Sequence, residues 1–582
     1  MFALSLSTFR ERWQLFLGAI VTVVLGVALV QSSLLVLVSG TSYVEAVTLL
    51  AMTLGIAAFL AIFIVGSTFA FTIAQRRRDL ALLRLVGGSR GQVRRLLLSE
   101  ALLLGVIGTA LGVPLGLVVM RVQAWLLRDL GFVPATFAAR WQDWILGVSA
   151  GIGLGVSLLG VLAASRRAAR VRPLEALRDT GNAARVMTGG RWFFGLLFLA
   201  GSIALVTVSR FAGMDGAVPL SINATITAAV ALSLLAPLVV PVLGRFAGGL
   251  VGANLRDGVR RSASTAAPLL VLVALVLGLS GTLSTMSEAG HRELQQDLAG
   301  DFVLASADVP RVPGILVAST ETAVRTSLAD PGEDEADDEE ALVVDADAYQ
   351  QVHRRAPVAG SLRDLHGTTV AAAGVPLGVM LAIDGVARRV VAVLPESVNA
   401  GPAYLLPRDS RPAIGPARTI LRVEPGVTVP EAQPADEWIA NQSSKQDSTN
   451  SGIMTVLMGL AGLYSLIAVI NAVVIAAAER RGEFAVARVT GMTRAEVVRM
   501  ALLESWAVAA IGLVLGAAAA AGTLFGIASA VSRISGSTPV SVPWQALVVV
   551  VAGAFAVVGL TSVCTSLSAT RRAPVTLIAA RE

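Results

Sequence analysis

Residue types that usually carry catalysis or metal binding are scarce in this sequence. Among 582 residues there are three histidines and one cysteine. They lie far apart in the chain, so their spacing supports neither a metal cluster nor a CxxC redox site. The single lysine lies in the stretch NQSSKQD, whereas an ATP-binding P-loop needs the pattern GxxxxGK[ST]. We therefore expect no catalytic residue, metal or cofactor from His291, His353, His366, Cys564 and Lys445.

The composition is typical of a membrane protein. Hydrophobic residues make up 55% and charged residues 15% of the chain, and the mean hydropathy is +0.73. These values exclude a soluble globular enzyme. A helix needs about 20 mostly apolar residues to cross the hydrocarbon core, and we find ten windows of that kind. They lie near residues 15–38, 45–74, 96–126, 143–165, 192–210, 219–244, 264–283, 452–478, 501–530 and 543–568.

Arginines indicate the side of the membrane on which each connecting segment lies. The chain has 46 basic and 40 acidic residues, and the basic residues gather in alternate segments between the windows. Because positively charged loops stay in the cytoplasm, both termini are predicted to be cytoplasmic. The same sidedness explains the net charge of +6, so no nucleic-acid partner is expected. Residues 284–450, between the seventh and eighth windows, are then extracytoplasmic.

The extracytoplasmic segment has the pattern of a mixed α/β domain. Short runs of β-forming residues, such as Thr368–Ala373 and Arg388–Leu394, are separated by proline and glycine. The segment also contains the acidic run Gly332–Glu340, GEDEADDEE. Such a run could dock a cationic peptide, but like charges repel one another, and we predict a solvated loop.

Two stretches of the chain match each other without gaps at an offset of 404 residues. The first reads RRRDLALLRLVGGSRGQVRRLLLSEALLLG from Arg76, and the second reads RRGEFAVARVTGMTRAEVVRMALLESWAVA from Arg480. We name residues 76–95 the first elbow and residues 480–499 the second elbow. The match extends beyond the elbows and pairs Glu100 with Glu504.

Each elbow has the features of a short amphipathic helix that turns into a long one. A glycine, Gly87 or Gly491, suits the end of the short helix because it adopts positive φ easily. A serine or threonine followed three residues later by Gln or Glu can then start the long helix as a capping box. Such elbows suit transmission of force from a cytoplasmic partner; interfacial helices with arginines on lipid phosphates are the alternative. The capping residues are Ser89 with Gln92 and Thr493 with Glu496.

The long helix after each elbow carries small residues at every fourth position. In lipid this spacing lets two helices approach closely, so we predict a helix-packing face and keep a pore lining as the alternative. The residues are Gly108, Gly112 and Gly116, and at the same offset Gly512, Gly516 and Ala520.

The sequence offers no energy source for transport within this chain. Secondary transporters mark their pathway with ionisable groups near the middle of the membrane, but here Glu45, Arg121 and Asp143 lie near the ends of their windows. Proton or sodium coupling is therefore disfavoured. Without a P-loop in this chain, any ATP hydrolysis has to come from a partner.

The two elbows resemble the signature of the FtsX-like permease domain, as found in MacB-type ABC transporters. The first copy has ALLRLVGGSRGQV, a glycine-spaced span, and the tail PLEALR (Pro173–Arg178) after the fourth span. The second copy has Met492 where the family has a small residue, and its tail lacks the ALR element. The order of ten spans, with the outer segment after the seventh, is similar to that of the bacitracin-type resistance permeases.

This resemblance implies that each elbow is a coupling helix for a separate P-loop ATPase subunit. Two elbows imply two ATPase copies, which bind the ATP and Mg²⁺. The family also implies a bacterial cytoplasmic membrane protein that exports a substrate or passes ATP-driven motion to its outer domain, a mode called mechanotransmission. Carried over by position, the coupling residues are Asp79, Leu82, Arg84, Gly87, Ser89 and Arg90, and Glu483, Val486, Arg488, Gly491, Thr493 and Arg494.

The resemblance also indicates the kind of substrate and partner. It implies a lipid-linked or amphipathic substrate: an antimicrobial peptide, a lipoprotein or a lipid. Besides membrane lipid, a peptide or lipoprotein ligand and a histidine kinase are candidate partners. One alternative is a sensor or scaffold whose outer domain detects a peptide or activates a cell-wall hydrolase without transport. A proton-coupled carrier is a further alternative.

The expected fold is that of a mainly α polytopic membrane protein with about ten transmembrane helices. Two FtsX-like four-helix repeats flank a two-helix linker, and one mixed α/β extracytoplasmic domain interrupts the second repeat. The expected limits are 1–180 for the first repeat, 181–262 for the linker, 263–283 for span seven, 284–450 for the outer domain and 451–582 for the rest of the second repeat.

Overall fold

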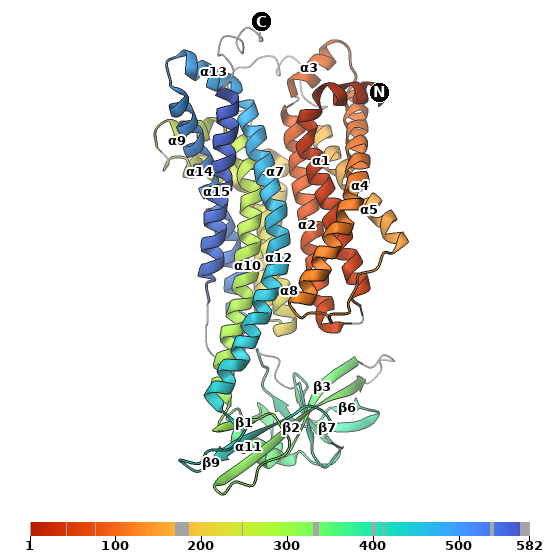
Figure 1. Ribbon diagram of the computed structural model, residues 1–582, viewed down its shortest axis with the longest axis vertical. Coiled ribbons are helices and arrows are strands. Elements are labelled where there is room, and N and C mark those ends of the chain that lie inside the picture. The colour runs from red at the N-terminus through yellow and green to blue at the C-terminus, as the bar shows by residue number, and fades with distance from the viewer. Residues whose placement is uncertain are drawn as a thin grey trace.

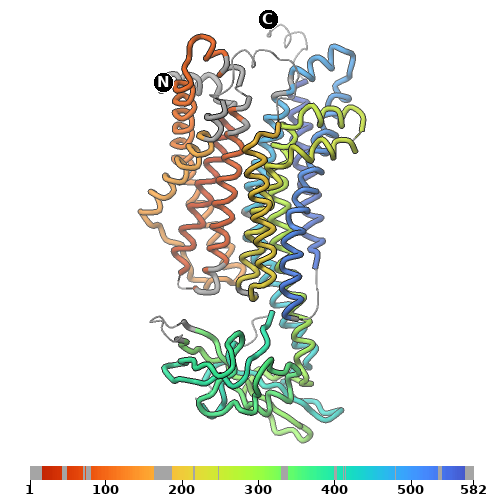
Figure 2. The backbone as a smooth tube through the Cα atoms, turned by 180° about the vertical axis from the view of Figure 1, so that it is seen from behind, coloured from red at the N-terminus to blue at the C-terminus, as the bar shows by residue number. Residues whose placement is uncertain are grey.

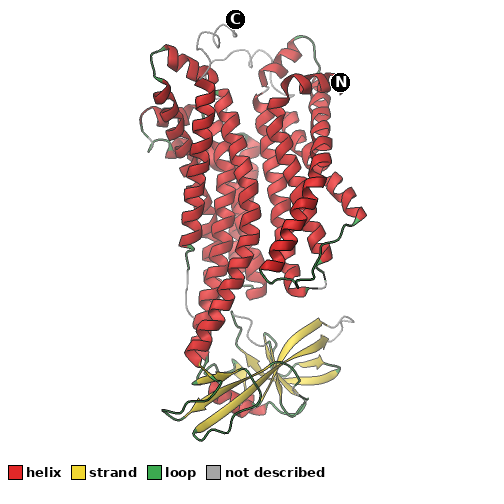
Figure 3. Cartoon of the chain, viewed as in Figure 1, coloured by secondary structure: helices red, strands yellow, loops and turns green. Residues whose placement is uncertain are grey.

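Long apolar helices fill one end of the protein and a β-sheet fills the other (Figures 1 and 3). This computed structural model contains, within the described residues, ten helices long and apolar enough to cross a membrane. They fall on the ten predicted windows, so the chain is a multi-pass membrane protein. The helices are α1 (Phe2–Ser39), α2 (Val44–Gln75), α4 (Arg90–Asp129), α5 (Asp143–Ala168), α7 (Gly189–Ser209), α8 (Met214–Leu243), α10 (Val259–Asp297), α12 (Ala435–Glu479), α14 (Arg494–Ser535) and α15 (Trp544–Thr570).

Parts of the chain lie outside this description. Among them is the segment with the predicted tail Pro173–Arg178, on which nothing further is said. The structure describes residues 2–41, 43–75, 77–168, 186–246, 248–329, 337–398, 403–410, 412, 414–535 and 541–570.

The membrane helices form two groups that correspond to the two repeats. In the first group α1 packs against α4, α2 and α5, and in the second group α10 packs against α14, α12 and α15. The hairpin of α7 and α8 packs on α14 and α10, and it therefore belongs with the second group (Figure 2). Helices suit this environment because lipid offers no hydrogen-bond partner to the backbone.

The two groups meet mainly where α12 lies against α2 and α1. The fully buried Tyr464 of α12 donates a hydrogen bond from its hydroxyl to the Thr22 carbonyl of α1 at 3.0 Å. Two glycines of α1 make room for α12 side chains: a Cβ on Gly26 would lie 3.0 Å from the Tyr464 hydroxyl, and a Cβ on Gly18 would collide with Asn471. Large polar side chains of α12 thus pack against glycines of α1 and join the two repeats.

Two membrane helices continue beyond the bundle into the sheet end. Helix α10 has 39 residues, which corresponds to about 57 Å at 1.5 Å per residue, and the hydrocarbon core is only about 30 Å thick. Helix α12, with 45 residues, starts directly after the last strand. The sheet is therefore mounted on two continuous helices (Figure 1).

The sheet end holds one mixed, ten-stranded sheet. Its path runs β10-β1-β9-β2-β3-β8-β5-β7-β4, with β6 paired to β2 and β7. Strands β3 and β8 pair in parallel, as do β5 and β7, and the other pairs are antiparallel. Beside it lie α11 (Ala346–Val352) and a short 3₁₀ turn, η1 (Leu362–Asp364). The strands are β1 (Phe302–Leu304), β2 (Ile315–Ala329), β3 (Asp337–Val344), β4 (Ala359–Gly360), β5 (Thr369–Ala373), β6 (Met380–Ile383), β7 (Val386–Leu394), β8 (Tyr404–Pro407), β9 (Ala417–Val423) and β10 (Gln433–Pro434).

Both predicted β runs are strands, β5 and β7, which confirms the mixed character of this region. The prediction of a solvated loop for the acidic run is wrong for its last four residues. Residues 337–340 belong to β3 and pair with β2, where Glu340 lies opposite Arg325. The apolar residues that follow fix the register of β3 in the sheet, and this pairing extends into the acidic residues.

Candidate functional site: two elbows and an ion cluster

Each elbow is a short helix that ends at a glycine and turns into a membrane helix. The short helices are α3 (Arg77–Leu85) and α13 (Arg481–Val489). Gly87 and Gly491 have φ of +102° and +105°, a conformation that strains any other residue. The glycine pattern therefore predicts both turns correctly.

Both predicted capping boxes are present. The Ser89 backbone N–H donates to Gln92 Oε1 at 2.8 Å, and the Gln92 N–H donates to Ser89 Oγ at 3.2 Å. In the second elbow the Thr493 N–H donates to Glu496 Oε2 at 2.7 Å, and the Glu496 N–H donates to Thr493 Oγ1 at 3.3 Å. Each box satisfies two backbone donors that have no partner within the helix, so the membrane helix starts at a fixed point.

The inner face of each elbow is anchored by apolar side chains at matched positions. In the second elbow the half-buried Met492 packs against this anchor, where the first elbow has Gly88. The departure from the small residue at this position therefore has a packing reason. The anchors are Leu80, Val93 and Leu97 in the first elbow, and Phe484, Val497 and Ala501 in the second.

The outer face of each elbow exposes apolar and charged residues. Val86, directly after α3, is 90% exposed, and Leu82 and Leu85 are exposed beside it. Val486 and Val489 are exposed on α13. The side chain of Asp79 lies outside the described part of the chain. Of the other predicted coupling residues, Gly87, Ser89, Arg90, Glu483, Gly491, Thr493 and Arg494 are exposed, and Arg84 and Arg488 are half-buried.

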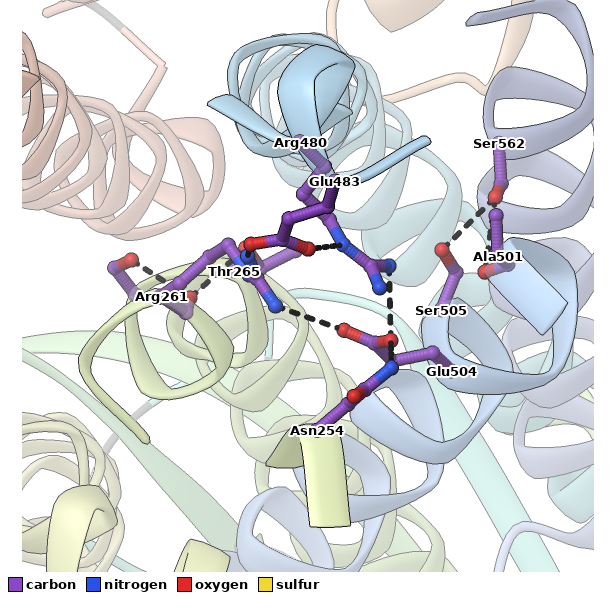
Figure 4. A network of polar contacts seen from close by, with 10 residues as sticks. Asn254, Arg261, Thr265, Arg480, Glu483, Ala501, Glu504, Ser505 and Ser562 are labelled. Atoms are coloured by element: carbon purple, nitrogen blue, oxygen red, sulfur yellow. Dashed lines mark hydrogen bonds and ion pairs between the residues drawn. The ribbon is translucent and has the colours of Figure 1, made fainter. Parts of the chain in front are cut away.

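A buried ion cluster lies beneath the second elbow (Figure 4). Its centre is Glu504 of α14, whose side chain is 6% exposed. Arg480, at the end of α12, contacts Glu504 Oε2 with Nη1 at 2.8 Å, and Arg261 of α10 contacts Oε1 with Nη2 at 3.0 Å. Asn254 of α9 (Gly249–Asp257) donates to Oε2 at 3.0 Å. We name residues 254, 261, 480, 483 and 504 the ion cluster.

Glu483 connects this cluster to α13. Its Oε2 accepts a hydrogen bond from Arg480 Nε at 2.8 Å, and its Oε1 lies 3.7 Å from Arg261 Nη1. The side chain of Glu483 is 58% exposed, so this contact is weaker than those of Glu504. The cluster thus joins five helices: α9, α10, α12, α13 and α14.

The corresponding place in the first repeat holds Glu100. Glu100 of α4 is buried like Glu504, but the small cavity beside it is lined mainly by apolar side chains such as Phe16, Phe69 and Leu104. Helix packing shows which residue of α1 corresponds to Arg261. Gly108 and Gly512 are paired by the 404-residue offset, and they lie against Val23 of α1 and Leu269 of α10, respectively. The offset from Val23 to Leu269 therefore makes Leu15 the residue of α1 that is equivalent to Arg261 of α10.

The small residues of α4 and α14 lie where these helices cross α1 and α10. A Cβ on Gly112 would lie 2.9 Å from the Val24 carbonyl oxygen, and a Cβ on Gly516 would lie 2.7 Å from that of Leu270. The backbones are therefore too close for a larger residue. The other members of the set have similar places: Gly108 faces Val23, Gly116 faces Ala28, Gly512 faces Ala266, and Ala520 packs with Val273 and Leu277.

A second polar cluster joins α10 to the sheet. His353 Nδ1 lies 2.7 Å from Asp297 Oδ2 of α10, and its Nε2 lies 2.7 Å from Glu321 Oε1 of β2. Tyr349 stacks on the His353 ring, and Arg418 Nη2 contacts Glu321 Oε2 at 2.8 Å. Two further contacts fix the same end of α10: Glu293 pairs with Arg355 and accepts a hydrogen bond from the Val398 N–H.

The charges around His353 favour its protonated form. Burial alone would lower the pKa of His353, but the hydrogen bonds and charges of Asp297 and Glu321 outweigh it and raise the pKa to about 9. Burial would raise the pKa of Glu321, but the hydrogen bond from His353 and the charge of Arg418 hold it below its usual value. His353 therefore donates from both ring nitrogens at neutral pH.

Sequence reasoning missed both clusters. Their members come from distant segments of the chain, so spacing along the sequence does not bring them together. The one available signal was the pairing of Glu100 with Glu504 across the repeat, because a carboxylate at the same place in two membrane helices is costly to bury unless it has a partner.

Within the described residues, ten membrane-length helices in two matched groups, each with an elbow at the same end, define a polytopic membrane protein with an internal repeat. A family model described as "FtsX-like permease C-terminal" matches residues 51–173 and 455–574, which include both elbows. Each of the two repeats therefore matches the FtsX-like permease domain.

Three relatives and structures are similar to parts of the chain. An "Uncharacterized ABC transporter permease protein" of Mycobacterium tuberculosis is 26% identical over 284 residues, 44% of this chain and 32% of that protein. The "Lipoprotein-releasing system transmembrane protein LolC" of Neisseria meningitidis serogroup B is 31% identical over 158 residues, 24% of this chain and 38% of that protein. The chain thus spans about a third of the length of these relatives.

The structural likeness is weaker. A crystal structure of a domain of a permease protein from Porphyromonas gingivalis has 20% sequence identity and covers 20% of this chain and 60% of that one. Its TM-score is 0.18.

Proposed function

We propose that this chain is the permease subunit of an ABC transporter and that a separate P-loop ATPase subunit docks on each elbow. The observation that carries this proposal is the pair of matched elbows at one end of the protein, each turned at a glycine into a membrane helix. Their outer faces combine exposed apolar residues with arginines, a composition suited to a protein interface. Two elbows on one chain correspond to two ATPase copies per permease.

In this proposal the chain is not an enzyme by itself. ATP and Mg²⁺ bind to the partner subunits, which supply the energy. The elbow end is cytoplasmic, as the arginine distribution predicts, and the sheet end is extracytoplasmic, in a bacterial cytoplasmic membrane. The sheet is mounted on α10 and α12, and this arrangement supports mechanotransmission, in which motion of the elbows reaches the sheet through the helices.

The substrate that we propose is lipid-linked or amphipathic: an antimicrobial peptide, a lipoprotein or a lipid. The partial similarity to a protein named as a component of a lipoprotein-releasing system supports this class. A peptide or lipoprotein ligand would bind at the sheet end, and a histidine kinase would contact the sheet or the membrane helices.

Co-purification tests the docking of ATPase subunits. The chain is purified from its native membrane in mild detergent, and subunit stoichiometry is measured by native mass spectrometry. We expect two P-loop ATPase subunits per chain, and we expect the double variant Arg84→Glu/Arg488→Glu to lose them. The matched control is Arg128→Glu, because Arg128 lies at the opposite end of α4. Two ATPase subunits retained on the double variant would refute the proposed docking site.

The second candidate function is a sensor or scaffold without transport. It is supported by the long helical connection between the sheet and the elbows, which could signal in either direction. The discriminating measurement is ATP-dependent release of a bound amphipathic peptide or lipid from vesicles that contain the complex. Release supports the transporter, whereas binding to the sheet end without release favours the sensor.

A further inference from the structure

The ion cluster borders a small cavity between the helices of the second repeat. The cavity has a volume of about 40 Å³ and is lined by residues of α10, α12, α14 and α15 and by Phe484 of α13. A buried water molecule needs about 10–15 Å³, so the cavity holds about three atoms of that size. It therefore has room for a small polar group but not for a peptide.

The charged part of the cavity lining is positive. Among the described residues, three charged side chains line the cavity: Arg261, Arg480 and Glu504. Both arginines contact the Glu504 carboxylate, at 3.0 and 2.8 Å, and these contacts hold their guanidinium groups beside the cavity. Glu483 also contacts both arginines, but its side chain is 58% exposed and is not part of the lining. An anion in the cavity would therefore compensate the second positive charge of the lining.

Two serine hydroxyl groups in the same lining are available to a ligand. Ser262 of α10 and Ser566 of α15 line the cavity and are only 2% and 1% exposed. Within the part of the chain that the structure describes, their Oγ atoms have no hydrogen-bond partner. Burial of a hydroxyl group without a partner is unfavourable. Because the two groups come from different helices and line one cavity, a single ligand can bind both.

The cavity lies at the level where the membrane helices leave the hydrocarbon core. Arg261 lies just before the seventh apolar window and Arg480 just after the eighth, and Ser566 lies near the end of the tenth. The headgroups of the lipid leaflet at the elbow end are found at this level. Basic pockets between membrane helices at this level are typical binding places for phosphate-bearing headgroups.

We propose that this cavity binds a phosphate group, to which Arg261 and Arg480 donate from their guanidinium groups and Ser262 and Ser566 from their hydroxyl groups. Guanidinium groups match phosphate oxygens in geometry and charge. Two sources offer this chemistry, a phospholipid of the adjacent leaflet and free phosphate, and the level of the cavity favours the phospholipid. The site needs no ATPase subunit, so it stands independently of the proposed function.

Binding measurements on the purified full chain test the site. Native mass spectrometry measures the binding of dioleoylphosphatidylglycerol and of dioleoylglycerol, which has the same acyl chains but no phosphate. Equilibrium dialysis measures the binding of radiolabelled inorganic phosphate. In Ser262→Ala/Ser566→Ala we expect the affinity for the phospholipid to fall by about tenfold or more, because a hydrogen bond to a charged group contributes about that factor. The thermal unfolding midpoint should not fall, since these hydroxyl groups have no partner among the described residues.

The matched control is Ser157→Ala/Ser221→Ala. These two hydroxyl groups are also buried and without a partner among the described residues, but they lie outside this cavity, so phospholipid binding should be unchanged. A loss of phospholipid binding alone in the cavity variant identifies the lipid as the source, and a parallel loss of inorganic phosphate binding identifies free phosphate. Phospholipid and phosphate binding that is equal in the two double variants overturns the proposal. A serine-dependent binding of dioleoylglycerol also overturns it, because that lipid carries no phosphate.

Discussion

The two repeats share their elbows, and each places a buried glutamate of a membrane helix beneath its elbow. Both elbows have the same positive-φ glycine, the same capping box and an apolar anchor at the same three positions. Under the second elbow Glu504 sits between two arginines, whereas Glu100 lies beside a mainly apolar cavity. The shared part fixes the shape of a surface at one end of the protein. In the second repeat, the contacts of Glu504 also connect this surface to α9 and α10.

The largest effect that separates the repeats is expected at Glu504. Replacement by leucine leaves Arg261 and Arg480 buried near each other without their carboxylate, which typically costs about 3–5 kcal/mol. Glu100→Leu removes the buried glutamate at the same position of the first repeat and provides the comparison. The measurement is the unfolding free energy of the purified chain in mixed detergent micelles. An unchanged unfolding free energy in Glu504→Leu would contradict the role of Glu504 at the centre of the ion cluster.

The next effect concerns pH at the sheet end. Because folding raises the pKa of His353 from 6.5 to about 9, its contribution to stability is complete below about pH 6.5 and is lost as pH rises through about 9. The contribution is on the order of 3 kcal/mol. Hydrogen exchange in α11 should therefore increase between pH 7 and pH 10 beyond the intrinsic rate change. His353→Gln should remove this pH dependence, and its persistence in that variant would exclude His353 as the cause.

A smaller effect is expected where the helices cross. In Gly112→Ala and Gly516→Ala the new methyl group meets the Val24 or Leu270 carbonyl, so the helices must separate, at about 1–3 kcal/mol. Both repeats should respond alike. Gly459→Ala on α12, where a Cβ meets no atom within 4 Å, is the matched control. Unfolding midpoints of the three variants provide the comparison, and an unchanged midpoint for either crossing variant would contradict the close approach.

The smallest effect should also be the most similar between the repeats. Gly87→Ala and Gly491→Ala place a Cβ on a residue with positive φ, where no other atom is close, so the cost is backbone strain of about 1 kcal/mol each. Thermal unfolding of the two variants should give matching shifts. A markedly larger shift for Gly491→Ala would mean that the second elbow depends on its turn more than the first.

Local features of the fold could be predicted from the sequence, and long-range features could not. The turns at Gly87 and Gly491 depend on residues at most five positions apart, so their signals survive in a single sequence. The ten helices follow from apolar length in the same way. The ion cluster instead brings Arg261 to Glu504, 243 positions away. The charge of each residue does not indicate which oppositely charged residue it contacts.

His353 illustrates the same limit from the other direction. Three scattered histidines give no reason to expect a histidine-rich metal site. Yet the count gives no hint that Asp297 and Glu321, 56 and 32 positions away, approach the ring from α10 and β2. The pairing depends on the register of the sheet against α10, which composition does not encode.

The two repeats belong to one polypeptide, and this has a consequence for symmetry. In a homodimer with a two-fold axis every substitution appears in both halves, so an arginine at the position of Arg261 would be present twice, as would any domain inserted after that helix. One chain with two repeats has no such axis. Each half can therefore change independently of the other. The equivalent positions 15 and 261, with leucine in one half and arginine in the other, are one such difference.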